Sequence, residues 1–177
     1  MAQFGTYAQL QTEIADWLDR SDLTSQIPAF IELAEASFNR IIRAPDMITK
    51  NDSFSISGQY NTLPSDTLEI VRIVVDIQPV IVLKYLTPQD LSELRATMTG
   101  TGKPYYFTLV GGSSNQLEVL RSPDQTYTSS IVYYTRIPAL TDSATTNWLL
   151  TANPDIYLYG ALVEAEPYLK NDERMPM

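Results

Sequence analysis

The sequence contains no cysteine and no histidine. The absence of cysteine excludes disulfides and thiolate nucleophiles, and the absence of both residues removes the usual ligands of zinc. Without imidazole, the commonest acid–base group of enzymes is missing as well. We therefore expect no metal, no cofactor and no enzymatic activity, and a function that depends on packing and on partners.

Charged residues are scarce and mostly acidic. They make up 19% of the chain, whereas hydrophobic residues make up 44%, which is too apolar for a disordered protein. Because this surface charge is low for a solitary monomer, we expect partners to cover part of the surface. The net charge of -9 and the pI near 4.4 argue against binding to nucleic-acid phosphates, which requires clustered lysine and arginine.

Long hydrophobic runs are absent too. No apolar run approaches the roughly 18 residues of a membrane span, and the start MAQFGTYAQL lacks the pattern of a signal peptide. We expect no insertion into a membrane and no export by this route. The length of 177 residues fits one domain, or one domain with an insertion, and by itself favours a single compact unit.

The N-terminal residues predict two helices. A capping box at Thr6 and Gln9 starts a helix over residues 7–19. Its apolar residues share one stripe: Leu10, Ile14, Trp17 and Leu18. Pro28 suits the first turn of a second helix, which ends near Arg43. The apolar stripe of this second helix has helical spacing and is widened on one flank: Ile27, Phe30, Ile31, Leu33, Ala34, Phe38, Ile41 and Ile42.

The middle of the chain alternates polar and apolar residues, as strands do. A hairpin is predicted around Gly58, and residues 69–86 predict two further strands, interrupted at Gln78 and Pro79. A short helix follows over residues 87–98, with Thr87 as cap.

Strands then resume. The stretches YYFTLV and QLEVL, joined by GGSSN, predict a strand pair, and residues 126–136 predict another strand. On that last strand one face has alternating residues: Tyr127, Ser129, Ile131 and Tyr133. The middle is therefore expected to be an antiparallel sheet.

Residues from 147 onward return to helix, with Asn153 as cap and Pro154 in the first turn. One face of this helix has the spacing of a buried stripe and is expected to pack against the first two helices: Leu158, Ala161, Leu162, Ala165 and Leu169.

A second apolar stripe points away from the first and consists of Ile156, Tyr159, Gly160 and Val163. A glycine inside a helix costs about 1 kcal/mol, so a neighbouring element is expected close to Gly160. The stripe is covered either by the β-rich part of the same chain or by another subunit, and we hypothesise that Gly160→Leu impairs assembly more than folding. Together with the charge cluster that follows, these are the candidate subunit or portal interface residues: Ile156, Tyr159, Gly160, Val163, Glu166 and Arg174.

Other motifs fit a structural role better than chemistry. GTGKP lacks the first glycine and the final Ser or Thr of a phosphate loop. Asp16, Asp19 and Asp22 lack the spacing of a calcium loop and fit a solvated helix face. The serines of GGSSN have no histidine to activate them.

Several tyrosines could stack on bases but lack interleaved basic residues, so packing is the better interpretation: Tyr85, Tyr105, Tyr106, Tyr133 and Tyr134.

Two stretches resemble the head–tail adaptor (connector) proteins of tailed bacteriophages, particularly those of short-tailed phages. They are TYAQLQTEIADWLDRSDLTSQIPAFIELAEASFNR at the start and NWLLTANPDIYLYGALVEAEPYLKNDER at the end. The resemblance is most specific where IPAFIELAE occurs together with PDIYLYGALVEAEPYL, and the β-rich middle matches by layout only.

The resemblance implies a virion protein, assembled in the host cytoplasm, that forms a ring of about twelve copies beneath the portal. Such a ring extends the DNA channel, passes double-stranded DNA without specific binding, and provides the attachment platform for the nozzle or other tail proteins. An acidic lumen would let DNA slide. Family members usually continue with further helical sequence that helps to dock onto the portal, whereas this sequence stops at MPM.

Together these observations predict an α+β protein. A helical bundle formed by residues 1–46 and 146–177 is interrupted by a central antiparallel β-rich insertion over residues 47–145. The alternative is a carbohydrate- or receptor-binding β module of a tail structure, in which exposed aromatic residues such as Tyr105 and Tyr106 stack on sugars.

Overall fold

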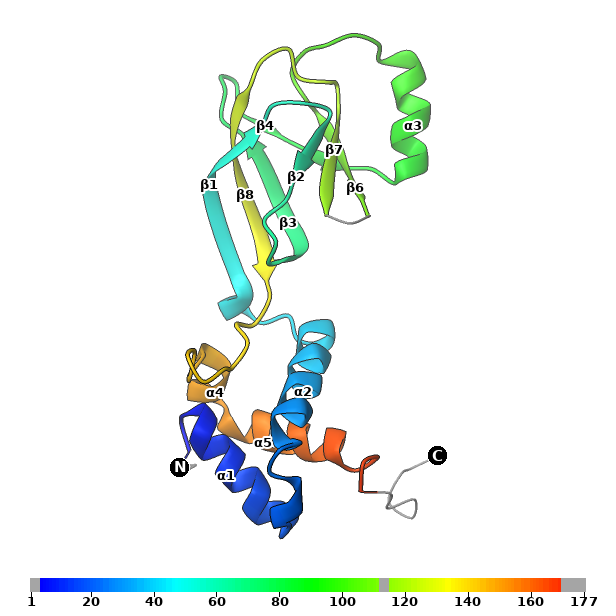
Figure 1. Ribbon diagram of the computed structural model, residues 1–177. Coiled ribbons are helices and arrows are strands. Elements are labelled where there is room, and N and C mark those ends of the chain that lie inside the picture. Colours follow the sequence, from blue (N-terminus) through cyan, green and yellow to red (C-terminus); the bar gives the residue numbers. More distant parts are fainter. Residues whose placement is uncertain (1–3, 112–114, 170–177) are drawn as a thin grey trace. The chain divides into compact units, whose positions relative to one another are not determined.

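The computed structural model describes residues 4–111 and 115–169, and its fold is mixed α+β (Figure 1). The chain divides into two compact units, so the single compact unit favoured by the length is wrong. The helical unit comprises Met1–Arg43 and Ile137–Met177, and the β unit comprises Ala44–Arg136. The expected domain boundaries at residues 46 and 146 stay a prediction, as does the description of the helices as a bundle.

The first two helices form close to where the sequence predicts them. Helix α1 spans Tyr7–Leu18, and its cap Thr6 accepts a hydrogen bond from the backbone N–H of Gln9. Helix α2 spans Ile27–Ile41 and has its proline in the first turn, where a missing N–H is not needed. A short 3-10 turn, Ser21–Leu23, lies between them.

The apolar stripes of these helices are only partly buried. In α1 the buried residues are Tyr7, Leu10 and Ile14, and in α2 they are Ile27, Phe30, Ile31, Ala34 and Glu35. Three members of the predicted stripes are exposed, namely Trp17, Leu33 and Ile41, with exposed fractions of 56%, 50% and 77%. Spacing identifies which residues share a face, but it does not show how wide a face the neighbouring helices cover.

The C-terminal helix of the prediction is two helices. Helix α4 spans Trp148–Ala152 and helix α5 spans Pro154–Ala165. Asn147 caps α4 and accepts from the N–H of Leu150 at 2.8 Å. Asn153 is the N-cap residue of α5, as predicted, although its side chain makes no capping hydrogen bond. Because Pro154 has no N–H to donate to the preceding turn, the helix breaks there.

Helix α5 packs against both α1 and α2, as predicted. Its buried residues are Tyr157, Leu158, Ala161 and Ala165. Leu162 and Leu169 of the predicted buried stripe are only half-buried, whereas Tyr157, which lies outside that stripe, is completely buried.

The β unit contains two four-stranded sheets within the described residues. The first has the order β1-β8-β3-β4, with bounds Ile48–Ile56, Tyr127–Thr135, Thr67–Val75 and Ile81–Val82. The second has the order β2-β7-β6-β5, with bounds Tyr60–Thr62, Gln116–Leu120, Tyr106–Val110 and Lys84–Tyr85. All neighbours are antiparallel except β5 and β6, which are parallel. A 3-10 turn, Pro45–Met47, precedes β1.

The predicted hairpin around Gly58 is wrong. Strand β1 pairs with β8 and strand β2 pairs with β7, so the chain passes from one sheet to the other at Gly58. The side chain of Asn61 fixes this crossing, since it accepts from Ser57 N–H at 2.9 Å and donates to the Gly58 carbonyl at 2.7 Å. A hairpin and two strands in facing sheets show the same alternation of polar and apolar residues, so periodicity alone could not distinguish them.

One apolar core joins the two sheets. It takes completely buried residues from both: Ile56, Ile73, Val75 and Ile131 from the first sheet, and Leu117 and Val119 from the second. The predicted inward face of β8 is confirmed, because Tyr127, Ser129, Ile131 and Tyr133 are all buried.

The predicted short helix is confirmed as α3, Pro88–Thr97, with Thr87 as its cap. Buried Leu91 and an ion pair of 2.8 Å between Arg95 and Glu118 hold it to the β unit. The strands predicted in residues 69–86 are three rather than two, namely β3, β4 and β5.

Candidate subunit interface

The candidate interface residues of α5 lie on its outer side. The exposed fractions of Tyr159 and Val163 are 55% and 65%, and Ile156 and Glu166 are intermediate. Within the described part of the helical unit, nothing buries Tyr159 and Val163. Arg174, the remaining charged candidate, lies outside the described residues.

Gly160 differs from the other candidates because it faces α2. A β-carbon built on Gly160 would lie 2.5 Å from Cζ of Phe38 and 3.4 Å from Cβ of Ala34. The close neighbour expected at this glycine is therefore α2 of the same chain. Gly160→Leu is therefore expected to disturb the packing of the helical unit itself, since a leucine would collide with Phe38.

Trp17 of α1 lies beside the exposed stripe of α5 and extends this exposed surface. Its ring lies edge-on against Tyr159, with 5.8 Å between the ring centroids, and more than half of each residue is exposed. The sequence prediction missed Trp17 because it assigned Trp17 and Leu18 to one stripe. Adjacent residues lie about 100° apart around a helix, so Trp17 and Leu18 cannot both point into one narrow buried face. This geometry could have identified Trp17 as a candidate exposed residue from the sequence.

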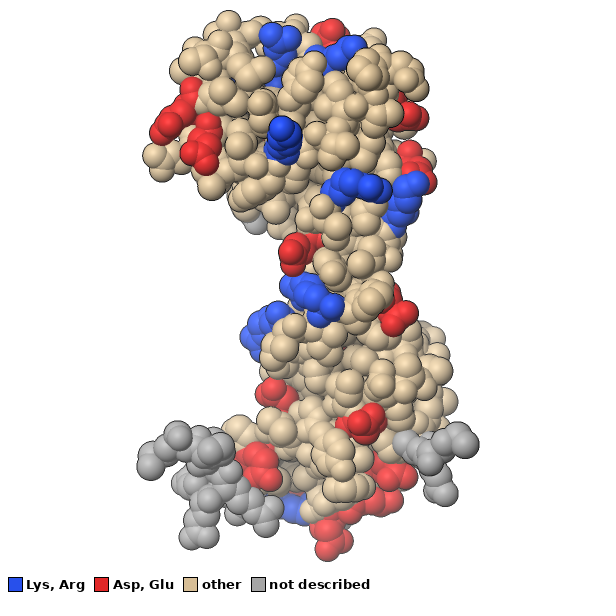
Figure 2. Space-filling model, turned by 180° about the vertical axis from the view of Figure 1, so that it is seen from behind, with Lys and Arg blue, Asp and Glu red and all other residues tan. Residues whose placement is uncertain are grey.

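We call the surface formed by Trp17, Ile156, Tyr159 and Val163 the aromatic patch. Acidic residues lie one helical turn before its two rings, Glu13 before Trp17 and Asp155 before Tyr159. Neither forms an ion pair within residues 4–111 and 115–169. On the face drawn in Figure 2, acidic side chains of the helical unit are scattered over largely uncharged surface, with few basic side chains between them.

The aspartates of α1 do not gather into a metal site. Arg20 donates two hydrogen bonds to Asp22 and lowers the pKa of that exposed carboxyl, while Asp16 and Asp19 line the same shallow surface as Arg20. Among the residues the structure describes, no group of three acidic side chains lies close enough together to hold a metal ion. The prediction of a solvated helix face fits this arrangement.

A buried polar network fixes α2 to α5 and to the segment before α4. The carboxyl of Glu35 accepts from the N–H of Leu140 at 2.8 Å and from the hydroxyl of Tyr157 at 3.1 Å. The amide of Asn147 donates to the same hydroxyl at 2.6 Å. Burial is the main cause of the raised pKa of Glu35, and burial also raises the pKa of Tyr157. Sequence periodicity gave no sign of this network, since Glu35 lies in a helix rich in apolar residues.

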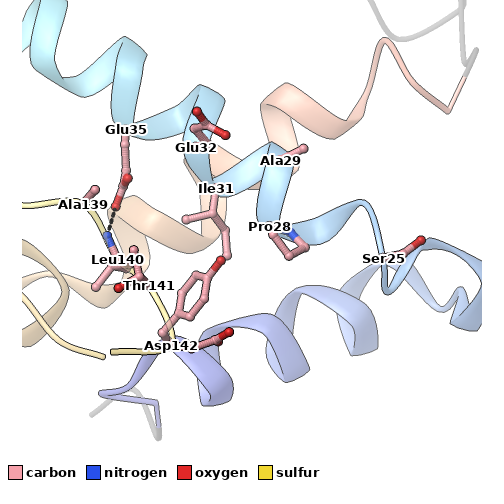
Figure 3. Close-up of a pocket in the computed structure, with 11 residues that line it drawn as sticks. Ser25, Pro28, Ala29, Ile31, Glu32, Glu35, Ala139, Leu140, Thr141 and Asp142 are labelled. Atoms are coloured by element: carbon pink, nitrogen blue, oxygen red, sulfur yellow. Dashed lines mark hydrogen bonds between the residues drawn. The ribbon is translucent and has the colours of Figure 1, made fainter. Parts of the chain in front are cut away.

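A cavity of about 570 Å³ adjoins this network within the helical unit (Figure 3). It is lined by Tyr7 of α1, by the first half of α2 and by residues 139–142, and Glu35 reaches across one side of it to Leu140. The hydrogen bonds from Leu140 and Tyr157 already occupy the carboxyl of Glu35, which is the most obvious candidate for a reactive group beside this cavity.

The tyrosines considered as a stacking platform have different roles. Tyr133 is buried in the core of the β unit, and Tyr106 and Tyr134 are half-buried. Tyr85 is more exposed and meets Phe107 edge-on, and Tyr105 is 41% exposed. The five tyrosines therefore do not form one exposed platform.

The GTGKP motif lies against residues 121–122. In GTGKP, Gly102 has a positive φ of 158° and lies against the side chain of Arg121, and Thr101 bridges to Ser122. The serines of GGSSN lie outside the described residues. Within the described ranges, no helix has the length and apolar character needed to cross a membrane.

The model of a protein family described as "SU10 adaptor protein" matches residues 5–177, which is almost the whole chain. No curated protein matches the sequence.

Proposed function

The chain belongs to the SU10 adaptor family, a family of phage head–tail adaptors, and from this premise we propose that it forms a ring beneath the portal of a tailed phage. It has a structural head–tail adaptor role and is a component of the virion. The resemblance seen in the two terminal stretches is thereby confirmed at the level of the family.

The single observation that supports the ring is the aromatic patch. Complete burial of a large apolar side chain stabilises by roughly 1.5–3 kcal/mol, so leaving Tyr159, Val163 and Trp17 half-exposed forgoes about half of this for each. Soluble monomers rarely keep several such residues together on one surface. A second copy of the chain that covers the patch removes this penalty, and a contact between two different surfaces generates a ring when the rotation between copies closes.

The further partners in the proposal are the portal protein, the nozzle or other tail proteins, and passing DNA. The ring has about twelve copies and extends the DNA channel. The acidic character of the helical unit supports a channel that lets double-stranded DNA slide without specific binding, because phosphates are repelled by carboxylates (Figure 2). No catalytic step is part of this proposal.

Mass measurement of the purified particle tests the proposal. Native mass spectrometry is expected to give one assembly of about twelve times the 19.9 kDa mass of the chain, and mixing with portal protein is expected to give a heavier complex. A chain that stays monomeric at high concentration, alone and with portal, would refute the ring. A ring without affinity for portal would refute the assigned position in the virion.

A further inference from the structure

Helix α2 exposes a second surface that no part of the described helical unit covers. Ala29, Leu33, Ala36 and Arg40 are all exposed, and they follow one another at intervals of four, three and four residues. This is the spacing of the contact positions in paired helices. We call this surface the α2 outer face.

The α2 outer face is suited to the close approach of another helix. Its two alanines are small, and Leu33, half-exposed between them, can insert into a partner. The opposite side of α2 is already occupied, since Ala34 and Phe38 pack on Gly160 of α5. At the start of this face, Tyr168 stands edge-on to Phe30 with 5.5 Å between the ring centroids, and it is 52% exposed.

The exposed stripe of α5 has matching length and spacing. Ile156, Tyr159, Val163 and Glu166 follow one another at intervals of three, four and three residues, which again is the spacing of helix contact positions. Trp17 widens this stripe from α1. Both stripes run for three turns, so each can meet the other along its whole length.

The charges of the two surfaces are complementary. The α2 outer face ends in Arg40, an exposed cation without an ion pair in the described residues. The α5 stripe is acidic at both ends, with Asp155 before Ile156 and Glu166 at its last position. Arg40 therefore meets an acid in either orientation of the helices, Glu166 if they run parallel and Asp155 if they run antiparallel. A contact between two α2 outer faces, or between two α5 stripes, would lack this pairing of opposite charges.

We infer that the α2 outer face of one copy docks onto the α5 stripe and Trp17 of the next copy. This inference rests on the proposed ring, and it specifies which surfaces form the contact between neighbours. The two surfaces are different parts of one subunit, so each copy uses one toward each neighbour and the contact propagates in one direction. A two-fold dimer in which the α2 outer face of each copy meets the α5 stripe of the other would stop at two copies, whereas a ring carries the contact from copy to copy.

Cysteine cross-linking of the full chain tests the contact directly, because the chain has no cysteine of its own. The double variant Ala36→Cys with Val163→Cys, treated with a short bis-maleimide, is expected to give a ladder of covalent multimers. Each single variant is expected to give little product, since identical surfaces do not meet. A ladder absent from the double variant, while its ring still forms, would overturn the inference.

Charge reversal provides an independent test. Arg40→Glu is expected to raise the concentration needed for half-maximal assembly by roughly tenfold or more. Adding Asp155→Arg or Glu166→Arg to Arg40→Glu restores assembly in one of the two double variants, and that variant gives the helix orientation. Failure of both double variants to recover would overturn the inference.

Lys84→Glu is the matched control, since it makes the same change of charge on the β unit, where Lys84 is exposed. It is expected to assemble like wild type, and its failure would mean that net charge, rather than this contact, controls assembly. Circular dichroism of each variant checks the fold. If the wild-type chain itself forms no ring, the proposed function fails; if it does but neither test succeeds, only the inference fails.

Discussion

Phe38 of α2 lies against the α-carbon of Gly160 of α5, so close that a β-carbon on the glycine would be 2.5 Å from Cζ of the ring. The glycine thus lets two helices of one chain approach each other. The same ring meets Tyr157 edge-on, with 5.3 Å between the centroids. A residue that the sequence suggested for contact between subunits is therefore part of the packing of each subunit.

Gly160→Leu is expected to destabilise the isolated chain by about 1–3 kcal/mol, because overpacking forces α2 and α5 apart. Urea unfolding followed by circular dichroism measures this loss. The double variant Gly160→Ala with Phe38→Leu is the control, since the smaller side chain makes room and alanine favours helix by about 1 kcal/mol over glycine. Equal stability of Gly160→Leu and wild type would contradict the packing seen here.

Glu35 is expected to make stability depend on pH. Its folded-state pKa is raised above the ordinary value of 4.5, chiefly by burial, so the protonated form is favoured in the folded chain. The contribution to stability is fully present below the unfolded pKa and is lost as pH rises through the folded pKa. Glu35→Gln cannot titrate, so its stability relative to wild type should increase with pH across that window. Urea titrations at several pH values measure the difference, and parallel curves would contradict the prediction.

Glu35→Ala tests the buried hydrogen bonds to the Glu35 carboxyl rather than its charge. Removing the acceptor leaves the N–H of Leu140 without its partner in a buried place, which typically costs about 1–3 kcal/mol. The loss should exceed that of Glu35→Gln, whose amide oxygen can still accept from Leu140 and Tyr157. Equal stability of the two variants would show that the hydrogen bonds contribute little.

Glu118 is expected to make the β unit sensitive to acid. Burial, the largest single influence, pushes its pKa up, but hydrogen bonds from Gln59 and Arg95 together outweigh burial and leave the pKa lowered. Such a group adds stability above its unfolded pKa, and this is lost as pH falls through the folded pKa. Arg95→Met should therefore reduce the stability at neutral pH more than at acidic pH. Thermal melts at both pH values measure this, and an effect independent of pH would contradict it.

Trp17 is expected to report assembly through its fluorescence. The chain has two tryptophans, so Trp148→Phe leaves Trp17 as the single emitter. As concentration rises and the aromatic patch becomes covered, emission should shift to shorter wavelength and quenching by acrylamide should fall. Trp17→Phe, which keeps Trp148, is the control and should change less. Trp17 emission that stays solvent-exposed in the assembled particle would exclude the patch from the contact.

The proposed insertion predicts that the helical unit folds without the β unit. Ile137 N–H donates to the side chain of Asn39 at 2.8 Å, so the two chain segments that leave the helical unit start side by side. Replacing residues 44–136 by a short Gly-Ser linker should leave the helical circular dichroism signal and a cooperative melt. Loss of cooperativity would contradict the division into independent domains.

Much of the local structure followed from the sequence because its causes are local. The caps at Thr6 and Thr87 and the proline at the start of α2, α3 and α5 determine where helices begin. The alternation in β8 determines which face is buried. The same periodicity could not show that Gly58 joins two different sheets, because pairing partners lie far apart in the chain.

The candidate interface illustrates the same division. The sequence by itself determined that α5 has apolar residues on two sides, that chemistry based on cysteine or histidine is absent, and to which family the chain belongs. Only the tertiary structure decided that Gly160 faces Phe38 while Tyr159, Val163 and Trp17 remain exposed, and that α2 presents a face ending in Arg40. The physical reason is that periodicity identifies which residues share a face, whereas burial depends on how many neighbouring helices reach that face.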